Sequence, residues 1–402
     1  MPPSGLDAPG ASSRLLVCLS HLRWDLVVQR PHHLLRRATA DYDVVYFEEA
    51  VRHDGPPKLV QRSDPSGVVI ATPHLAHDDV DPDRTIRRML DRLIASRPHA
   101  SLVAWYYTPM ALSYAGHLDA DVCVYDCMDE LSAFRFAPPA LIRREAELFE
   151  RADIVFTGGR SLHEAKRDRH PNVLCLPSSI DTAHFAKSRG RVADPADQAA
   201  IPHPRIGFFG VIDERMDLDL LRHSAEALPD VQFVILGPVV KIDPATLPQA
   251  ANIHWLGSKP YTDLPAYLGN WDAGWMPFAR NESTRFISPT KTPEFLAAGL
   301  PVASTPIVDV VAEYGRAGLV EIAEGVEMVA ALTRTLQGMS PRRRKAVDAA
   351  LAKTSWDRTW ATMRDEVARL TRSEVLLPAP SRAPGNTLVA APKPAASVPD
   401  HA

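Results

Sequence analysis

The chain contains the stretch Arg285-Phe-Ile-Ser-Pro-Thr-Lys-Thr-Pro-Glu-Phe-Leu-Ala-Ala-Gly-Leu-Pro-Val-Ala-Ser-Thr305, which reads as a loop, a short helix and a strand in immediate succession. Pro293 is tolerated only in the first turn of a helix, and Thr290 or Thr292 can cap that turn. Gly299 ends the helix, and Pro301 prevents its continuation. We therefore expect a helix at 293–298 and a strand at 301–303.

The start of this helix has the chemistry of a phosphate site. Lys291 and Glu294 are three residues apart, so their side chains share one face of the helix. The free backbone N–H groups favour an anion, and Lys291 adds a positive charge beside them. Glu294 can accept hydrogen bonds from sugar hydroxyls, so the pair suits a nucleotide-sugar. The alternative is that Lys291 is solvated and Glu294 only favours the helix dipole.

The same stretch resembles the donor-binding segment of retaining glycosyltransferases of the GT-B fold, in the form Ser-Pro-x-Lys-x-x-Glu-(aromatic)-x-Ala-x-Gly-x-Pro-Val. The resemblance implies that Lys291 contacts the donor diphosphate and that Glu294 contacts the ribose. Many members carry a further glutamate eight positions earlier. This chain has Phe286 there, and Glu282 is the nearest substitute.

Size and composition predict two soluble domains. The chain has 402 residues, of which 46% are hydrophobic and 23% charged, as in ordinary globular proteins. Its net charge of −4 gives no basic field for nucleic acid. We expect reduced thiols at the four cysteines, no signal peptide and no membrane-spanning segment, hence a cytoplasmic protein.

Short apolar runs alternate with amphipathic segments, which predicts an α/β fold with parallel sheets. We expect two Rossmann-like domains facing across a cleft, as in GT-B proteins, with the last helix crossing back to the N-terminal domain. The expected divisions are a disordered segment at 1–12, an N-terminal acceptor domain at 13–186, a linker at 187–203, a C-terminal donor domain at 204–355, a crossover helix at 356–372 and a disordered Pro/Ala-rich tail at 373–402.

A second candidate loop follows the strand at 205–209. Gly210 lets the chain turn closely past a ligand, and Arg215 stands at the start of the next helix. The resemblance implies that Arg215 contacts the diphosphate; the alternative is a surface salt bridge. Lys259, after another strand, is a candidate contact for the nucleotide base. The donor-side candidates are therefore Gly210, Arg215, Lys259, Ser288, Pro289, Thr290, Lys291 and Glu294.

The N-terminal half supplies the acceptor-side candidates. His21, Arg30 and His33 follow the first strand, and their Gln-Arg-Pro-x-His pattern resembles a bacterial subgroup of family-one and family-four-like glycosyltransferases. Asp126 and Asp129 follow a later strand, where a carboxylate can orient an acceptor hydroxyl or cap a helix. The place where many relatives carry a histidine, at 107–109, has none.

Together these features predict a glycosyltransferase of the hexosyltransferase class that moves a sugar from a nucleoside diphosphate sugar to a cell-surface glycan or glycolipid precursor in polysaccharide biosynthesis. The resemblance alone implies that the transfer is retaining. UDP is the preferred nucleotide. We assign catalysis to Arg215, Lys291 and Asp129, because the leaving diphosphate must be neutralised. A nucleotide-sugar epimerase and a non-catalytic nucleotide-sugar-binding protein remain alternatives.

We expect no cofactor and no metal, because the donor loop already carries cations. The helix with Arg84, Arg87, Arg88 and Arg92 is basic. It is either a solvated face or a peripheral contact with anionic lipid at the inner face of the membrane.

Overall fold

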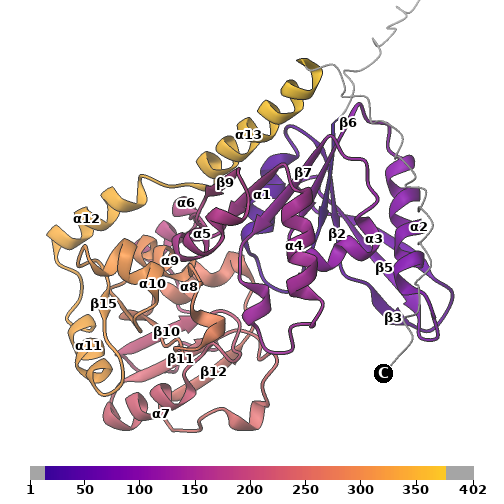
Figure 1. The fold of residues 1–402 in the computed structure, drawn as a ribbon. Helices are drawn as coiled ribbons and strands as arrows, with labels where there is room; N and C mark the ends of the chain where they lie inside the picture. The colour runs from indigo at the N-terminus through magenta and orange to yellow at the C-terminus, as the bar shows by residue number, and fades with distance from the viewer. Residues whose placement is uncertain (1–13, 377–402) are drawn as a thin grey trace, which may run out of the picture.

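The structure is a computed structural model of the chain that describes residues 14–376. The expected disorder at 1–12 and over most of the tail lies outside the described residues. Residues 373–376, which we expected in the tail, instead continue the last helix, α13 (Trp356–Leu376). Figure 1 shows two α/β domains, with α13 running from the second onto the first.

The first domain is built on a nine-stranded sheet with the order β3-β5-β2-β1-β6-β7-β8-β9, and β4 pairs with β5. All pairings are parallel except β4 with β5. The strands are β1 (Arg14–Leu19), β2 (Asp43–Phe47), β3 (Val51–His53), β4 (Lys58–Ser63), β5 (Val69–Ala76), β6 (Ser101–Tyr106), β7 (Val122–Cys127), β8 (Ile154–Thr157) and β9 (Val173–Cys175). The sequence did not predict β3 and β4, because β4 is exposed at nearly every position and forms no apolar run.

Helices cover both faces of this sheet. Those of the first domain are α1 (Arg30–Ala38), α2 (Pro82–Ala95), α3 (Leu112–Ala115), α4 (Leu141–Arg151) and α5 (Arg160–Lys166). Leu90, Leu112 and Leu148 of α2, α3 and α4 pack into one hydrophobic cluster. Leu34 of α1 and Trp360 of α13 belong to the other. The first domain therefore buries both faces of its sheet, as a parallel sheet requires.

The second domain has a parallel six-stranded sheet with the order β12-β11-β10-β13-β14-β15. Its strands are β10 (Arg205–Phe209), β11 (Gln232–Leu236), β12 (Ile253–Gly257), β13 (Ala273–Met276), β14 (Val302–Ser304) and β15 (Glu321–Ile322). Its helices are α6 (Thr182–Phe185), α7 (Leu218–Ala227), α8 (Leu264–Leu268), α9 (Lys291–Ala298), α10 (Val308–Val310), α11 (Glu327–Thr335) and α12 (Pro341–Leu351). Gly299 ends α9 in the left-handed conformation at φ 89°, as its sequence predicts.

The segment expected as a linker is packed against the second domain. Ser188 donates a hydrogen bond to the Pro265 carbonyl, and Trp271 donates from its indole nitrogen to Gln198. Ile180 and Phe185, which precede that segment, belong to the core of the second domain. The chain thus enters the second core before the expected boundary at 186.

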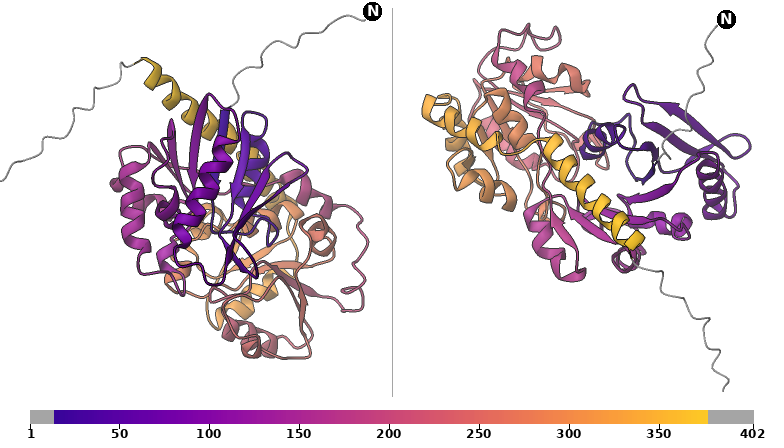
Figure 2. Two further views of the ribbon diagram at one scale, coloured as in Figure 1. Left: turned by 90° about the vertical axis from the view of Figure 1, so that its right-hand side faces the viewer. Right: turned by 90° about the horizontal axis from the view of Figure 1, so that it is seen from above.

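Helix α13 returns to the first domain (Figure 2). Trp356 and Trp360 are buried in the first domain's core together with Met363. The Trp360 indole donates to Asp41 at 3.2 Å, and Arg37 Nε donates to Asp357 at 2.6 Å. The stripe of apolar residues that the sequence shows every three or four positions is therefore the face that contacts the other domain.

Each sheet has one point where the strand order reverses. In the first sheet β1 lies between β2 and β6, and in the second β10 lies between β11 and β13. Ligands of such sheets bind beyond the carboxyl ends of the strands at this point. A ligand is therefore expected at the loops after β1 and β10. Within residues 14–376, no helix is both long and apolar enough to cross a bilayer.

Candidate functional site

Two adjoining cavities lie between the domains. The larger, of about 380 Å³, is lined by residues 24–28 after β1 and by residues of the second domain that follow β10, β11 and β12 or belong to α9. The smaller, of about 140 Å³, adds residues that follow β7, β9 and β13. Val27, Val28 and Lys291 line both. The cavities therefore form one continuous candidate site.

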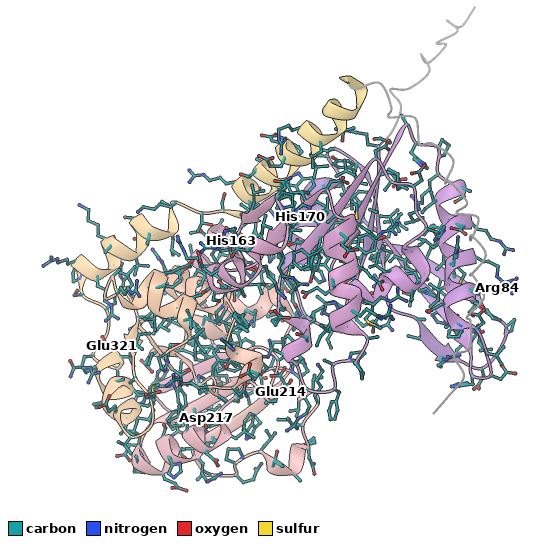
Figure 3. The ribbon with its side chains drawn as sticks, viewed as in Figure 1. Arg84, His163, His170, Glu214, Asp217 and Glu321 are labelled. Carbon is teal, nitrogen blue, oxygen red and sulfur yellow. The ribbon has the colours of Figure 1, made fainter. Side chains whose placement is uncertain are left out.

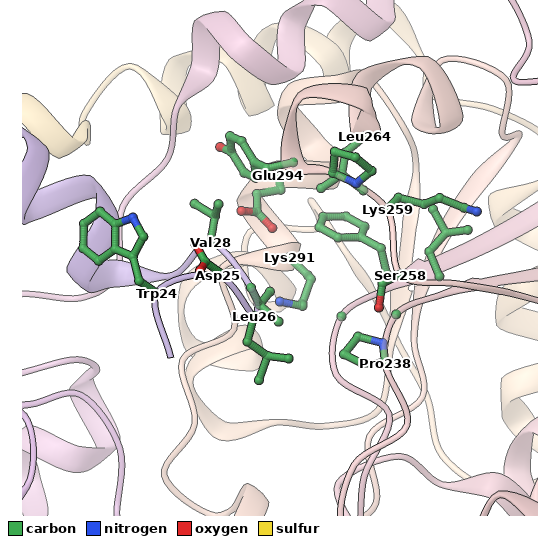
Figure 4. Close-up of a pocket in the computed structure, with 17 residues that line it drawn as sticks. Trp24, Asp25, Leu26, Val28, Pro238, Ser258, Lys259, Leu264, Lys291 and Glu294 are labelled. Carbon is green, nitrogen blue, oxygen red and sulfur yellow. The ribbon is translucent and has the colours of Figure 1, made fainter. Parts of the chain in front are cut away.

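Lys291 stands at the centre of this site (Figure 4). Burial lowers the pKa of its amino group, and the charge of Arg215 lowers it further. Its Nζ lies 5.6 Å from the Phe209 ring centroid, and it has no hydrogen bond or ion pair within residues 14–376. A Cβ at Gly210, where φ is 144°, would lie 2.5 Å from Lys291 Cε. Glycine at 210 therefore gives the lysine room to approach.

Glu294 lies beside Lys291 in the larger cavity (Figure 4). Burial raises the pKa of its carboxyl to about 7, and Lys291 acts in the opposite direction. Thr290 Oγ1 lies 3.5 Å from a carboxylate oxygen of Glu294. The carboxyl is thus weakly held and is available to accept hydrogen bonds from hydroxyl groups.

The loop before α9 lines the smaller cavity with Ser288, Pro289 and Thr290. The helix begins at Lys291, two residues earlier than expected, so Thr290 is its N-cap. Neither threonine caps it with a side chain, because Thr290 makes no such bond and Thr292 Oγ1 donates to the Met276 sulfur. Neither threonine side chain therefore competes with an anion for the N–H groups at the helix start, where residues 292–294 are buried.

Arg215 lines the smaller cavity but is already paired. Its guanidinium donates to both oxygens of Asp213, at distances from 2.7 to 3.1 Å. Its Cζ also lies 5.3 Å from the Phe134 ring centroid. Arg215 therefore reaches the cavity, as expected. It also forms a salt bridge, but with Asp213, two residues away in the sequence.

Asp129 joins Arg215 and Lys291 at the smaller cavity. Burial raises the pKa of its carboxyl to about 6, and the charges of Arg215 and Arg30 oppose that rise. A carboxyl with this pKa can hold or release a proton near neutral pH.

The expectation that Asp126 lies at the acceptor side of the cleft is wrong. Asp126 is fully buried and lines neither cavity, because it is paired with Arg30. Arg30 Nε donates to both Asp126 oxygens, at 3.0 and 3.1 Å, and its Nη1 donates to the Leu176 carbonyl at 2.7 Å. Arg30 itself borders the smaller cavity. The pair joins α1 to β7, so its first role is structural.

The two candidate histidines lie outside both cavities. The His33 ring stacks on Trp356 with centroids 4.7 Å apart and packs edge-on against Tyr261, and burial lowers its pKa to about 3. His33 thus packs where α1, α13 and the second domain meet. His21 has a buried Nδ1 without a partner among the described residues.

Lys259 and Glu282 are also placed differently from expectation. Lys259 borders the larger cavity, but its amino group is 2.6 Å from Asp197 and points away from Lys291 (Figure 4). Glu282 is 78% exposed, lies 3.8 Å from Arg285 and borders neither cavity. Glu282 therefore does not replace the second glutamate of the resembled family.

Sequence reasoning expected the loop after the first strand to reach the cleft, but it did not single out residues 25–28. The segment 24–28 covers the larger cavity from the first domain. It is anchored where Trp24 N–H donates to Glu48 at 2.7 Å, and the Trp24 indole donates to Asp64 at 3.1 Å. Leu26 remains 52% exposed. The position directly after the first strand was the available signal, since that loop faces the cleft.

Sequence comparison finds two similarities. Residues 203–338 match the family described as Glycosyl transferases group 1. The putative teichuronic acid biosynthesis glycosyltransferase TuaH of Bacillus subtilis is 24% identical over 238 residues, which cover 54% of this chain. The chain spans 59% of the length of that relative. The second domain therefore has the sequence pattern of a glycosyl transferase group 1 domain.

Comparison with solved structures shows the fold. A UDP-forming α,α-trehalose-phosphate synthase from Burkholderia vietnamiensis has a TM-score of 0.63 at 17% identity, covering 90% of this chain and 99% of that one. A trehalose-6-phosphate synthase analysed for glycosyl transfer with retention has a TM-score of 0.62 at 15% identity, covering 88% and 99%. The fold is GT-B, as the sequence predicts.

Proposed function

We propose that the protein is a glycosyltransferase of the hexosyltransferase class that uses a nucleoside diphosphate sugar. The carrying observation is Lys291, whose amino group lies at the junction of both cavities without a partner among residues 14–376, beside the carboxyl of Glu294. A buried cation is stabilised when an anion binds next to it. The diphosphate would lie on Lys291 and the first turn of α9, and the ribose hydroxyls on Glu294.

The smaller cavity suits the transferred sugar. Asp129, Ser178 and Ser288 offer polar atoms there, and Arg215 adds charge toward the leaving diphosphate. In this proposal the second domain binds the donor and the first binds the acceptor. Arg215, Lys291 and Asp129 are the proposed catalytic residues.

The relatives support finer choices. One structural relative is described as UDP-forming and the other as a case of transfer with retention, which supports UDP as the nucleotide and retention as the outcome. The Bacillus relative is named for teichuronic acid, which supports a cell-surface glycan or glycolipid precursor as the acceptor.

The proposal is tested by titrating the full chain with UDP, GDP, ADP and dTDP in a calorimeter, and then with their sugars. We expect UDP to bind most tightly and UDP-sugar to turn over when acceptor is present. Sugar isomerisation without acceptor would favour an epimerase, and tight binding without any turnover would favour a binding protein.

Independence from metal is part of the proposal, because Lys291, Arg215 and the start of α9 can carry the charge that a metal would otherwise neutralise. Transfer should therefore continue unchanged in EDTA. Complete loss of transfer, restored by Mg²⁺ or Mn²⁺, would contradict it.

We also propose a cytoplasmic protein that contacts the inner face of the membrane through α2. Arg84, Arg87 and Arg92 are exposed on this helix, and Arg84 lies at the outer edge of the first domain (Figure 3). Vesicles rich in anionic lipid should retain the protein, and replacement of the three arginines by glutamine should release it.

A further inference from the structure

The ring of Phe134, on a loop of the first domain, lies close to two cations of the second domain. The loop after β7 carries Phe134, and the loop after β11 carries Lys241. Lys241 Nζ and Arg215 Cζ each lie 5.3 Å from the Phe134 ring centroid. Arg135 N–H donates to Glu214 Oε1 at 3.1 Å, which ties the first loop to the second domain; Figure 3 labels Glu214.

The two loops also hold strained backbone. Among the described residues, Phe136 at φ 65° and Lys241 at φ 63° are the non-glycine residues with positive φ. L-residues with large side chains rarely adopt this conformation. Such strain persists where the surroundings impose it, and it gathers at ligand sites. Here both strained residues lie on the loops that meet over one ring, one in each domain.

Lys241, like Lys291, has no counter-charge within the described residues, whereas two other cations of the cleft are paired. Arg215 is paired with Asp213 and Lys259 with Asp197. Lys241 is exposed and has no hydrogen bond or ion pair within the described part of the chain. A ligand can therefore approach its amino group, whose charge no carboxylate neutralises.

The neighbourhood of Lys241 faces the cleft. It is three residues from Pro238, which lines the larger cavity, and it shares Phe134 with Arg215, which lines the smaller one. Burial lowers the pKa of His21, a residue of the opposite domain, to about 4, and the charge of Lys241 lowers it further. Lys241 therefore stands between the domains beside both cavities while lining neither.

We propose that Lys241 is the anion-binding residue of the acceptor site, and that the acceptor carries a phosphate or a carboxylate which binds beside the Phe134 ring. The inference rests on the proposed function, because an acceptor has meaning only for a transferase. The donor diphosphate has Lys291 and Arg215 in the cavities. Lys241 is an unpaired cation next to these two residues, so it is suited to bind a second anion.

The test uses the full chain saturated with UDP, so that the donor site is occupied. Calorimetric titrations with inorganic phosphate, glucuronate and neutral glucose separate the phosphate, carboxylate and uncharged cases. We expect wild type to bind phosphate or glucuronate at least tenfold more tightly than Lys241→Gln, and glucose to bind equally to both. Lys345→Gln, at an exposed lysine of α12 that lines neither cavity, is the matched control and should behave as wild type.

A second variant separates binding from stability. Lys241→Gly removes the charge and places glycine at a left-handed position, so we expect the anion affinity to fall while the melting temperature stays equal or rises. The UDP affinity should change less than twofold in both variants.

Equal anion binding by wild type and Lys241→Gln would overturn the proposal. So would a fall in UDP affinity as large as the fall in anion affinity, because Lys241 would then belong to the donor site. Failure of wild type to bind UDP would count against the proposed function instead. The same comparison of anion binding, made without UDP, would still decide the role of Lys241.

Discussion

Arg30 on α1 and Lys291 at the start of α9 border the smaller cavity from opposite domains. Burial alone would lower the pKa of Arg30, but Asp126 and Tyr107 together outweigh it and the pKa lies above its ordinary value. The pKa of Lys291 is lowered by burial, and Glu294 only partly opposes this. The fold compensates the first charge and leaves the second for a ligand.

The difference shows how a buried charge in a cleft is to be interpreted. A cation that the protein pairs at 3.0 Å is part of the fold, because its removal leaves a buried carboxylate without a partner. A cation without a partner makes the empty site less stable and the occupied site more stable. Proximity to a cavity does not separate the two cases, whereas the partners do.

The largest expected effect is the loss of the compensated charge. Arg30→Met leaves Asp126 buried and unpaired, so the free energy of unfolding should fall by about 3–5 kcal/mol. Denaturant titration measures this fall. The double variant Arg30→Met, Asp126→Leu should recover much of the stability, and an unchanged single variant would contradict a structural role for the pair.

A pH dependence of stability should follow from Glu294. Its pKa is about 7 in the folded protein and its ordinary value is 4.5, so the folded state binds more protons between these values. The free energy of unfolding should then decrease as the pH rises from about 5 to 7, by about 2–3 kcal/mol. Glu294→Gln should remove this decrease and leave a smaller one from Asp129, whose pKa is about 6. Melting curves from pH 4.5 to 8 would show parallel slopes for both proteins if the assignment is wrong.

Loss of the uncompensated charge should affect binding rather than folding. Lys291→Ala removes a charge-assisted phosphate contact, and we expect UDP binding to weaken by about 2 kcal/mol. The melting temperature should stay close to that of wild type, because Lys291 has no partner to leave behind within the described chain. A folded variant with unchanged UDP affinity would remove Lys291 from the donor site.

The smallest effect is expected at Lys259. Its amino group is held by Asp197 at 2.6 Å, and Asp197 is 42% exposed. Lys259→Ala should cost less than about 1 kcal/mol of stability, as other partly exposed ion pairs do. Calorimetry should find the UDP affinity unchanged. A loss similar to that of Lys291→Ala would show that Lys259 leaves Asp197 to contact the nucleotide.

The fold was predicted where a signal is local. The strands β10, β11 and β13 begin and end where the apolar runs do. The loop with Ser288 and the pair Lys291 and Glu294 also come together as expected, because one helix start positions them. By contrast, β4 is an exposed edge strand without an apolar pattern.

The site was predicted less well where a residue's role depends on a distant partner. Arg30 and Asp126 are 96 positions apart, and nothing near either one in the sequence announces their pairing. Lys259 and Asp197 are a second case, and the stacking of His33 on Trp356 is a third. Spacing shows which residues reach the cleft, but only the folded chain shows which of them are already occupied.

Helix α13 has a consequence for exchanging parts between relatives. In chain order it follows the second domain, yet Trp356, Trp360 and Met363 fill the core of the first. A donor half transplanted from another protein must therefore be joined at two places, before α6 and again before α13. A single junction would bring in a foreign helix, and its side chains would pack poorly in the core of the host's first domain.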